Sequence, residues 1–242
     1  MTGKRPAARP AAPPASEPSF GPELFDFLDD LRANNSKEWF AANRARYDEH
    51  VLEPALVFIE DFAPRLEGIS RHFQAVAKAQ GGSLFRIHRD TRFSKDKSPY
   101  KTNIGIHFRH ATARDAHAPG FYLHLERGSV FVGAGIWHPD GPTLQRLREA
   151  IIDDPESWLA ASRAPGLGGG LELWGESLKR PPAGFDPQHP LVEDLKRKDF
   201  VAARTVDESA AVGGGFIEQV EECYQSAVPL LRFLCKALGV AF

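Results

Sequence analysis

The chain has 242 residues, of which 42% are hydrophobic and 26% charged, and its 30 basic and 32 acidic side chains give a formal net charge of −2. This apolar content excludes an intrinsically disordered chain, and two cysteines are too few for a disulfide scaffold. No apolar run is long enough to span a membrane. The charge balance excludes a globally basic nucleic-acid binder, although it is compatible with a local basic patch.

Residues 1–19 contain five prolines and five alanines, and they lack the apolar stretch of a secretory signal. They predict a disordered tail, followed by a single α+β domain over residues 20–242. Cys223 and Cys235 lie too far apart for a C-x-x-C site, and we expect reduced thiols that pack as small hydrophobes. Reduced cysteines without a secretory signal favour a cytoplasmic protein.

Apolar spacing predicts helices at both ends of this domain. Pro22 suits the first turn of a helix whose apolar face extends to Leu31. Ser36 is expected to cap a second helix that runs through Tyr47, and Pro54 is expected to break or restart it. Further helices, each with an apolar face or a proline near its start, are predicted from residue 142, from residue 155, over 191–198 and over 216–238 with an interruption near Pro229.

Alternating apolar and polar residues between these helices predict β-strands. The predicted strands cover residues 83–89, 103–109, 121–126, 130–137, 171–174 and 200–206. Short links between them indicate a mainly antiparallel sheet with one face on a core, flanked by N-terminal and C-terminal helices. Gly133 and Gly135 share one face of their strand, which leaves room there for a ligand or another backbone, or for Trp39 or another aromatic residue to pack.

Positive charge is concentrated in residues 86–101, here called the cationic loop, which read R-I-H-R-D-T-R-F-S-K-D-K-S-P-Y-K. Six cations against two carboxylates give this segment a formal charge of +4, so the rest of the chain sums to −6. Such an island predicts docking of an anion, most simply a phosphate or a carboxylate. The expected ligand-binding residues are Arg86, Arg89, Arg92, Lys97, Tyr100 and Lys101.

A structural reading of the same charges is also open. Asp90 can pair with Arg86 or Arg92, and the cluster would then be compensated within the protein. The link over about residues 90–102 is long for a hairpin, and long loops in compact domains are usually functional or disordered. Spacing alone does not decide between an anion site and an ion-pair network.

The cationic loop contains the string Arg86-x-x-Arg89-Asp90-x-Arg92-Phe93, followed by Asp96-Lys97 and Tyr100. This string resembles the signature of domain of unknown function family 2461, a widespread, mainly bacterial family of uncharacterised proteins. Further segments share the likeness, namely Asn34-Asn35, Glu38-Trp39-Phe40, Tyr47 and residues 99–103 and 120–124. The resemblance covers about residues 20–240, and it implies a shared polar site in the loop but no reaction.

Histidines lie on the strands beside the cationic loop. His88, His107 and His124 could converge with Glu126 on one polar face if their strands are neighbours. Their spacing matches no metal-binding motif, so we predict no metal and no cofactor. His124 and Asp90 are the candidate catalytic residues for moving a proton.

Two classes of function follow from these features, and the sequence does not decide whether the protein is an enzyme. In the first, the cationic loop binds a phosphorylated small molecule or a nucleic-acid backbone, with Tyr100, Tyr122 and Phe93 available to stack bases of a single strand. In the second, a hydrolase or transferase acts on a phosphate-containing substrate, and the arginines stabilise charge in the transition state. A structural or interaction protein is a third reading.

Overall fold

The structure is a computed structural model that describes residues 16–92, 94–112, 118–163 and 167–242. Most of the predicted tail, and Phe93 of the cationic loop, therefore lie outside the described residues. Ser16 contacts the C-terminal part of the chain, since its Oγ donates to the Glu218 carboxylate at 2.7 Å and its carbonyl accepts from the Gly215 N–H at 3.1 Å.

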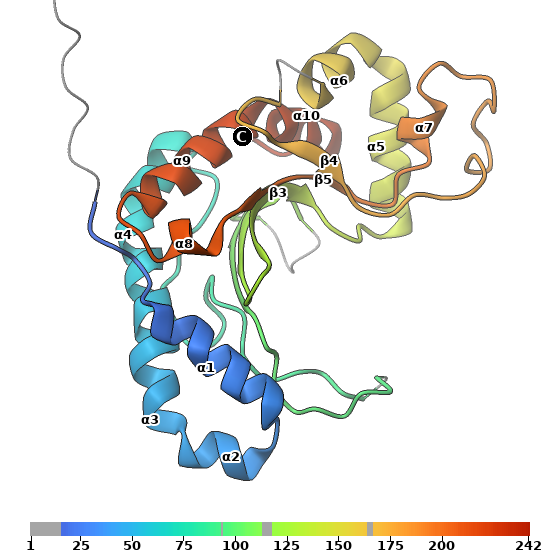
Figure 1. The fold of residues 1–242 in the computed structure, drawn as a ribbon. Coiled ribbons are helices and arrows are strands. Elements are labelled where there is room, and N and C mark those ends of the chain that lie inside the picture. Colours follow the sequence, from blue (N-terminus) through green and yellow to red (C-terminus); the bar gives the residue numbers. More distant parts are fainter. Residues whose placement is uncertain (1–15, 93, 113–117, 164–166) are drawn as a thin grey trace, which may run out of the picture.

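The N-terminal half forms a helical layer, seen in blue and cyan in Figure 1. Its elements are α1 (Pro22–Ala33), α2 (Lys37–Ala42), α3 (Arg44–Tyr47), the π-helical segment η1 (Asp48–Leu52) and α4 (Glu53–Ile69). Ser36 caps α2 as predicted, since its Oγ accepts from the Trp39 N–H at 3.2 Å. Pro54 restarts the helix rather than breaking it, because it lies in the first turn of α4, where no N–H is needed.

The sheet contains five antiparallel strands in the order β1-β2-β3-β5-β4. Their bounds are β1 (Ile104–Arg109), β2 (Gly120–Leu125), β3 (Val130–Ile136), β4 (Glu172–Trp174) and β5 (Phe200–Val206). The α+β prediction is confirmed. The strand predicted over 83–89 is wrong in detail, because within the described residues this segment forms only isolated bridges, from Leu84 to Ile106 and from His88 to Tyr100.

Helices resume after β3. They are α5 (Gly141–Asp153), α6 (Pro155–Ser162), α7 (Val192–Leu195), α8 (Glu208–Ala211), α9 (Phe216–Ser226) and α10 (Val228–Leu238). The helix predicted over 191–198 is shorter than expected, because the chain there turns to pair with residues 176–178, as in the Lys198 N–H to Glu176 carbonyl bond of 2.8 Å. No helix in the described ranges has the length and apolar character to cross a bilayer.

The core lies between one face of the sheet and helices α4, α9 and α10 (Figure 1). Phe62 of α4 stacks on Phe108 of β1 with ring centroids 5.1 Å apart, and Tyr224 of α9 lies 4.7 Å from Phe121 of β2. Alternation places the apolar residues of β1 and β2 on this inner face. Cys223 and Cys235 are free and buried here, as predicted, and burial raises the pKa of the Cys223 thiol to about 11.

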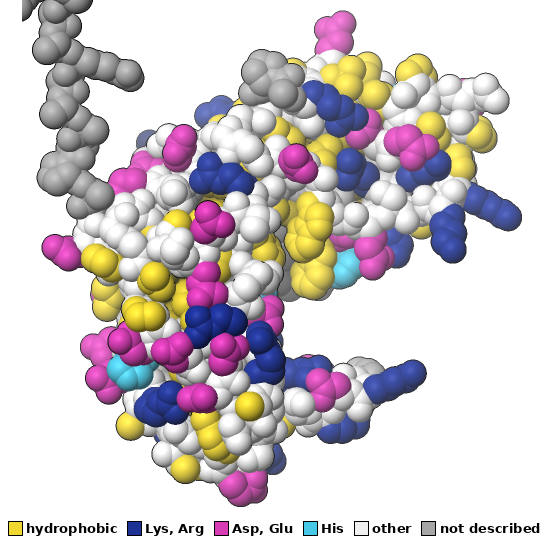
Figure 2. Space-filling view, viewed as in Figure 1, with side chains coloured by type: hydrophobic (Ala, Val, Ile, Leu, Met, Phe, Trp, Pro, Cys, Tyr) yellow, Lys and Arg dark blue, Asp and Glu magenta, His cyan; other side chains and the backbone are white. Residues whose placement is uncertain are grey.

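The opposite face of the sheet is partly exposed and lines a hollowed side of the molecule (Figure 2). The glycines predicted to make room on this face admit a neighbouring backbone. A Cβ at Gly135 would lie 2.1 Å from the Phe200 carbonyl oxygen, and Gly135 has a φ of +140°. A Cβ at Gly133 would lie 2.9 Å from the Ala202 carbonyl oxygen. Close pairing of β3 with β5 therefore explains both residues.

Candidate functional site

The cationic loop projects from the edge of the sheet as an irregular two-armed ribbon. The Phe85 N–H donates to the Gly105 carbonyl of β1 at 2.9 Å, the Lys101 N–H donates to Ile87 at 2.8 Å, and the Arg89 N–H donates to Pro99 at 2.9 Å. These bonds satisfy backbone groups on both arms without a regular strand.

Asn35, at the corner between α1 and α2, holds the base of this loop. Its Nδ2 donates to the Tyr100 carbonyl at 3.0 Å, and its Oδ1 accepts from the Tyr100 N–H at 3.1 Å. The Tyr100 ring stacks on Phe40 of α2 with centroids 4.1 Å apart and 19° between the planes. Tyr100, predicted to bind a ligand, is thus buried and also fixes the loop on the helical layer.

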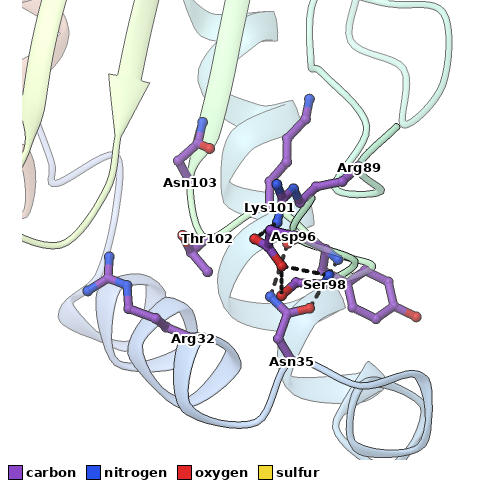
Figure 3. Close-up of a pocket in the computed structure, with 9 residues that line it drawn as sticks. Arg32, Asn35, Arg89, Asp96, Ser98, Lys101, Thr102 and Asn103 are labelled. Carbon is purple, nitrogen blue, oxygen red and sulfur yellow. Dashed lines mark hydrogen bonds and ion pairs between the residues drawn. The ribbon is translucent and has the colours of Figure 1, made fainter. Parts of the chain in front are cut away.

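A hollow of about 430 Å³, here called the cationic hollow, opens beside the base of the loop. Figure 3 shows Arg32 projecting from α1 on one side, and Arg89, Asp96 and Lys101 gathered on the other. The lining residues come from the end of α1, the cationic loop and the chain that leads into β1, and they are Arg32, Asn35, Arg89, Asp96, Ser98, Tyr100, Lys101, Thr102 and Asn103.

The charges of the cationic loop are partly compensated within the protein. Arg89 pairs with Asp96, whose carboxylate also accepts from the N–H and the hydroxyl of Ser98. Arg92 pairs with Asp90 through two nitrogens, at 2.9 and 2.6 Å. The Arg92 hydrogen bonds lower the pKa of Asp90 to about 2, and the Ser98 and Arg89 bonds hold the pKa of Asp96 below its usual range.

The compensation does not extend to Lys101. Its Nζ lies 5.3 Å from the centre of the Phe85 ring, and no carboxylate of the described chain forms an ion pair with it. Burial lowers the pKa of Lys101, and the nearby positive charge of Arg86 lowers it further. Burial and a neighbouring cation both disfavour the charged form of a lysine.

A chain of hydrogen bonds runs along β2 towards the cationic hollow. The Tyr122 hydroxyl contacts His124 Nδ1 at 3.2 Å, and His124 Nε2 contacts Glu126 at 3.2 Å. The other Glu126 oxygen accepts from Arg32 at 3.1 Å and from Thr102 at 3.3 Å, and both residues line the hollow. Burial lowers the pKa of His124, so the imidazole is neutral at neutral pH, and a proton on Nε2 satisfies both contacts.

The chain matches the family described as conserved hypothetical protein, DUF2461, over residues 23–233. It belongs to this family. No curated protein matches the chain at significant similarity.

In this DUF2461 chain the three strand histidines do not converge. His107 lies over Gly120 of the neighbouring strand, where a Cβ would come within 2.2 Å of its Nε2. His88 instead packs against Tyr100 with ring centroids 5.1 Å apart. Within the described ranges, no three histidine, cysteine or acidic side chains are grouped so that they could hold a metal ion.

The predicted site residues of the DUF2461 chain fall into two groups. Arg89, Tyr100 and Lys101 line the cationic hollow. The other three, Arg86, Arg92 and Lys97, are exposed outside its lining, and Lys97 donates to the Thr91 carbonyl at 2.9 Å. Of the candidate catalytic residues, His124 does not line the hollow and is connected to it only through Glu126, which contacts the lining residues Arg32 and Thr102. Asp90 pairs with Arg92, and a carboxyl with a pKa of about 2 holds a proton poorly at neutral pH.

Sequence reasoning missed the part of the hollow that comes from the helical layer. Arg32 pairs with Asp29 and Glu126 and reaches the hollow from the last turn of α1. Nothing in its local sequence distinguishes it from any other basic residue near a helix end. The sequence points to Asn35 only through the family likeness, although an asparagine that follows a helix can also bind a distant backbone.

Proposed function

We propose that the protein binds an anionic group of the phosphate class, carried by a ligand, in the cationic hollow. Three of the lining residues are cations, Arg32, Arg89 and Lys101, against one lining carboxylate, Asp96. Lysine attracts a phosphate as a point charge, and the planar arginine fork can bind two of its oxygens at once. Ser98 adds a neutral hydrogen-bonding group on the same wall.

Lys101 is the observation that carries this proposal. Ion pairs account for Arg92, as the structural reading predicts, and also for Arg89, but they leave Lys101 half buried against an aromatic ring and beside Arg86. Holding an ammonium there without a partner costs free energy. A bound anion would remove that cost, so the hollow is better adapted to the bound state than to the empty one.

Calorimetric titration with sulfate and with pyrophosphate tests the proposal. The wild-type protein should bind both, and Lys101→Met should weaken binding about tenfold, as expected for loss of a charge-assisted contact of 1.4 kcal/mol. Lys95→Met is the matched control, because Lys95 belongs to the same loop but does not line the hollow. The proposal fails if neither anion binds, or if the two variants behave alike.

The hydrogen-bonded chain along β2 favours a second candidate function. In a hydrolase or transferase acting on a phosphate-containing substrate, His124 would move a proton while Arg32 and Lys101 stabilise the developing charge. Its neutral imidazole, held by Glu126, suits this role. His124→Gln should then abolish phosphate release from a panel of phosphate esters while sulfate affinity stays within about twofold of wild type. A binding protein would show no such release in either form.

A further inference from the structure

A continuous row of rings crosses the partly exposed face of the sheet, beginning near the cationic hollow, where Lys101 lies over Phe85. Neighbouring centroids lie 6.0 Å apart from Phe85 to Tyr122, 5.8 Å from Tyr122 to Phe131 and 5.3 Å from Phe131 to Trp174. His124 stacks on Phe131 at 4.5 Å with 12° between the planes. These five residues, Phe85, Tyr122, His124, Phe131 and Trp174, are here called the aromatic strip.

The backbone of β1 makes room for the first two rings of the strip. A Cβ at Gly105 would lie 2.6 Å from the Tyr122 hydroxyl and 3.0 Å from the Phe85 ring. Only glycine at this position of β1 therefore lets both rings lie against the strand. Because the rings also support one another, the strip is a preorganised surface, and a ligand would lose little side-chain entropy on binding to it.

The far end of the strip is open to solvent. Trp174 is 56% exposed, and among the large hydrophobic residues of the described chain only Trp137, at the end of β3, is more exposed, at 60%. Figure 2 shows hydrophobic side chains (yellow) at the upper wall of the hollowed side and Lys and Arg side chains (dark blue) on the projecting loop opposite. Exposed tryptophan beside a hollow is typical of a binding surface.

The strip is too long for a single phosphorylated metabolite held in the cationic hollow. The centroid steps from Phe85 through Tyr122 and Phe131 to Trp174 are 6.0, 5.8 and 5.3 Å, so the strip extends at most about 17 Å, from the segment beside β1 to the edge strand β4. A mononucleotide anchored by its phosphate beside Lys101 would reach only the first rings. Sheet surfaces of this kind, with aromatic rings on neighbouring strands, stack two or three successive bases of a single strand.

We infer that the aromatic strip stacks the bases of a single-stranded nucleic acid whose phosphates contact the cationic hollow and loop. This inference rests on the proposed anion site and adds the class of ligand. The charges of the protein and of the proposed ligand are complementary. Arg86 and Lys101 adjoin Phe85 at one end of the strip, where they can bind phosphates, and the strip itself consists of uncharged rings that can contact bases. A duplex is excluded as the ligand, because its bases are already stacked on one another and cannot turn their faces to the rings.

Fluorescence anisotropy with a labelled single strand of about ten nucleotides tests the inference. This length lies within the range of binding-site sizes known for proteins that bind single strands. The comparison probes are an abasic strand of the same length, which keeps the phosphates, and the matched duplex. The intact strand should bind more than about tenfold more tightly than either, since each stacked base contributes about 1–3 kcal/mol.

Variants of the strip separate stacking from charge. Trp174→Ala and Phe131→Leu should each reduce affinity for the intact strand about tenfold, the loss expected for one stacked base, and leave affinity for the abasic strand and for sulfate unchanged. Trp174 is exposed on a short edge strand, so its replacement leaves the core intact. Leu159→Ala, an exposed apolar truncation on α6, is the control.

The possible results distinguish this inference from the function on which it rests. Equal binding of the intact and abasic strands, both weakened by Lys101→Met, would overturn the stacking role and leave the anion site standing. Absence of binding to every polyanion, sulfate included, would overturn both. Selective loss of the intact strand in Trp174→Ala would support both.

Discussion

The ammonium of Lys101 lies 5.3 Å from the centre of the Phe85 ring, at the point where the cationic hollow meets the aromatic strip. The ring face attracts the cation and partly replaces the water that burial removes. Arg86 opposes this effect, because its charge and the burial together lower the pKa of Lys101. Lys101 is therefore held in place by an aromatic ring but has no acidic partner among the described residues.

This arrangement predicts a pH dependence of anion binding. A bound anion stabilises the charged ammonium and raises the pKa of Lys101, so binding is linked to uptake of a proton once the pH exceeds the lowered pKa. Sulfate affinity should therefore fall as the pH rises from about 7 towards about 10.4, the ordinary lysine pKa. Sulfate keeps its charge over this range, so calorimetry reports on the protein. Lys101→Met should remove most of the slope, and an unchanged slope would contradict the assignment.

The two arginine pairs of the cationic loop are predicted to differ in function. Arg89 lines the hollow, whereas the Arg92 side chain is 76% exposed outside the lining. Arg89→Ala should weaken pyrophosphate binding about tenfold, and Arg92→Ala less than about twofold, because only the first removes a cation in contact with the ligand. Competition titration measures both. Equal effects would indicate that the loop acts through its total charge and not through the hollow.

Asn35 should control both folding and binding. Replacing it by alanine leaves the N–H and the carbonyl of Tyr100 without their partners, which should destabilise the protein by about 2–3 kcal/mol. Sulfate affinity should fall as well, because the base of the loop is no longer held. Asn34→Ala is the matched control, since the exposed Asn34 side chain donates to the Asp30 carbonyl at 2.9 Å and its loss should cost less than about 1 kcal/mol. Urea unfolding and titration of both variants separate the two effects.

Most of the secondary structure follows from local patterns. In β1, apolar residues such as Ile106 and Phe108 alternate with glycine and polar residues. A shift of one residue in the register with β2 would turn these apolar side chains away from the core, so the pattern fixes the register. The strand over 200–206 has its predicted bounds. The segment over 83–89 has a similar pattern but was predicted wrongly, since partners outside the segment decide whether a backbone pairs continuously.

Less of the candidate site could be predicted from the sequence, because only some of its contacts join residues that are close together in the chain. The pair between Asp90 and Arg92 joins neighbours two residues apart and was anticipated. The reach of Arg32 from α1, and the contact of Phe131 with Trp174, depend on how distant elements pack. β5 separates β3 from β4, and the rings of Phe131 and Trp174 approach each other across it, with centroids 5.3 Å apart. Strand order of this kind is not encoded in any single segment.

His107 provides a test of the packing beside the aromatic strip. It is buried, lies over Gly120 and adjoins Phe85 with centroids 5.7 Å apart. Burial, with a smaller contribution from the charge of Arg109, lowers the pKa of His107 to about 4. In the unfolded chain its pKa is about 6.5, so below that pH the unfolded state takes up a proton that the folded state does not bind.

Stability should therefore be complete above about pH 6.5 and should fall as the pH drops towards about 4, with a loss from this residue of about 3 kcal/mol. Urea unfolding across this range measures the loss. His107→Phe keeps a planar ring over Gly120 and removes the titration, so its stability should change less with pH, whatever its absolute stability. Parallel pH profiles for the two proteins would show that the imidazole is accessible to protons in the folded state, and that the packing beside the strip is looser than the structure indicates.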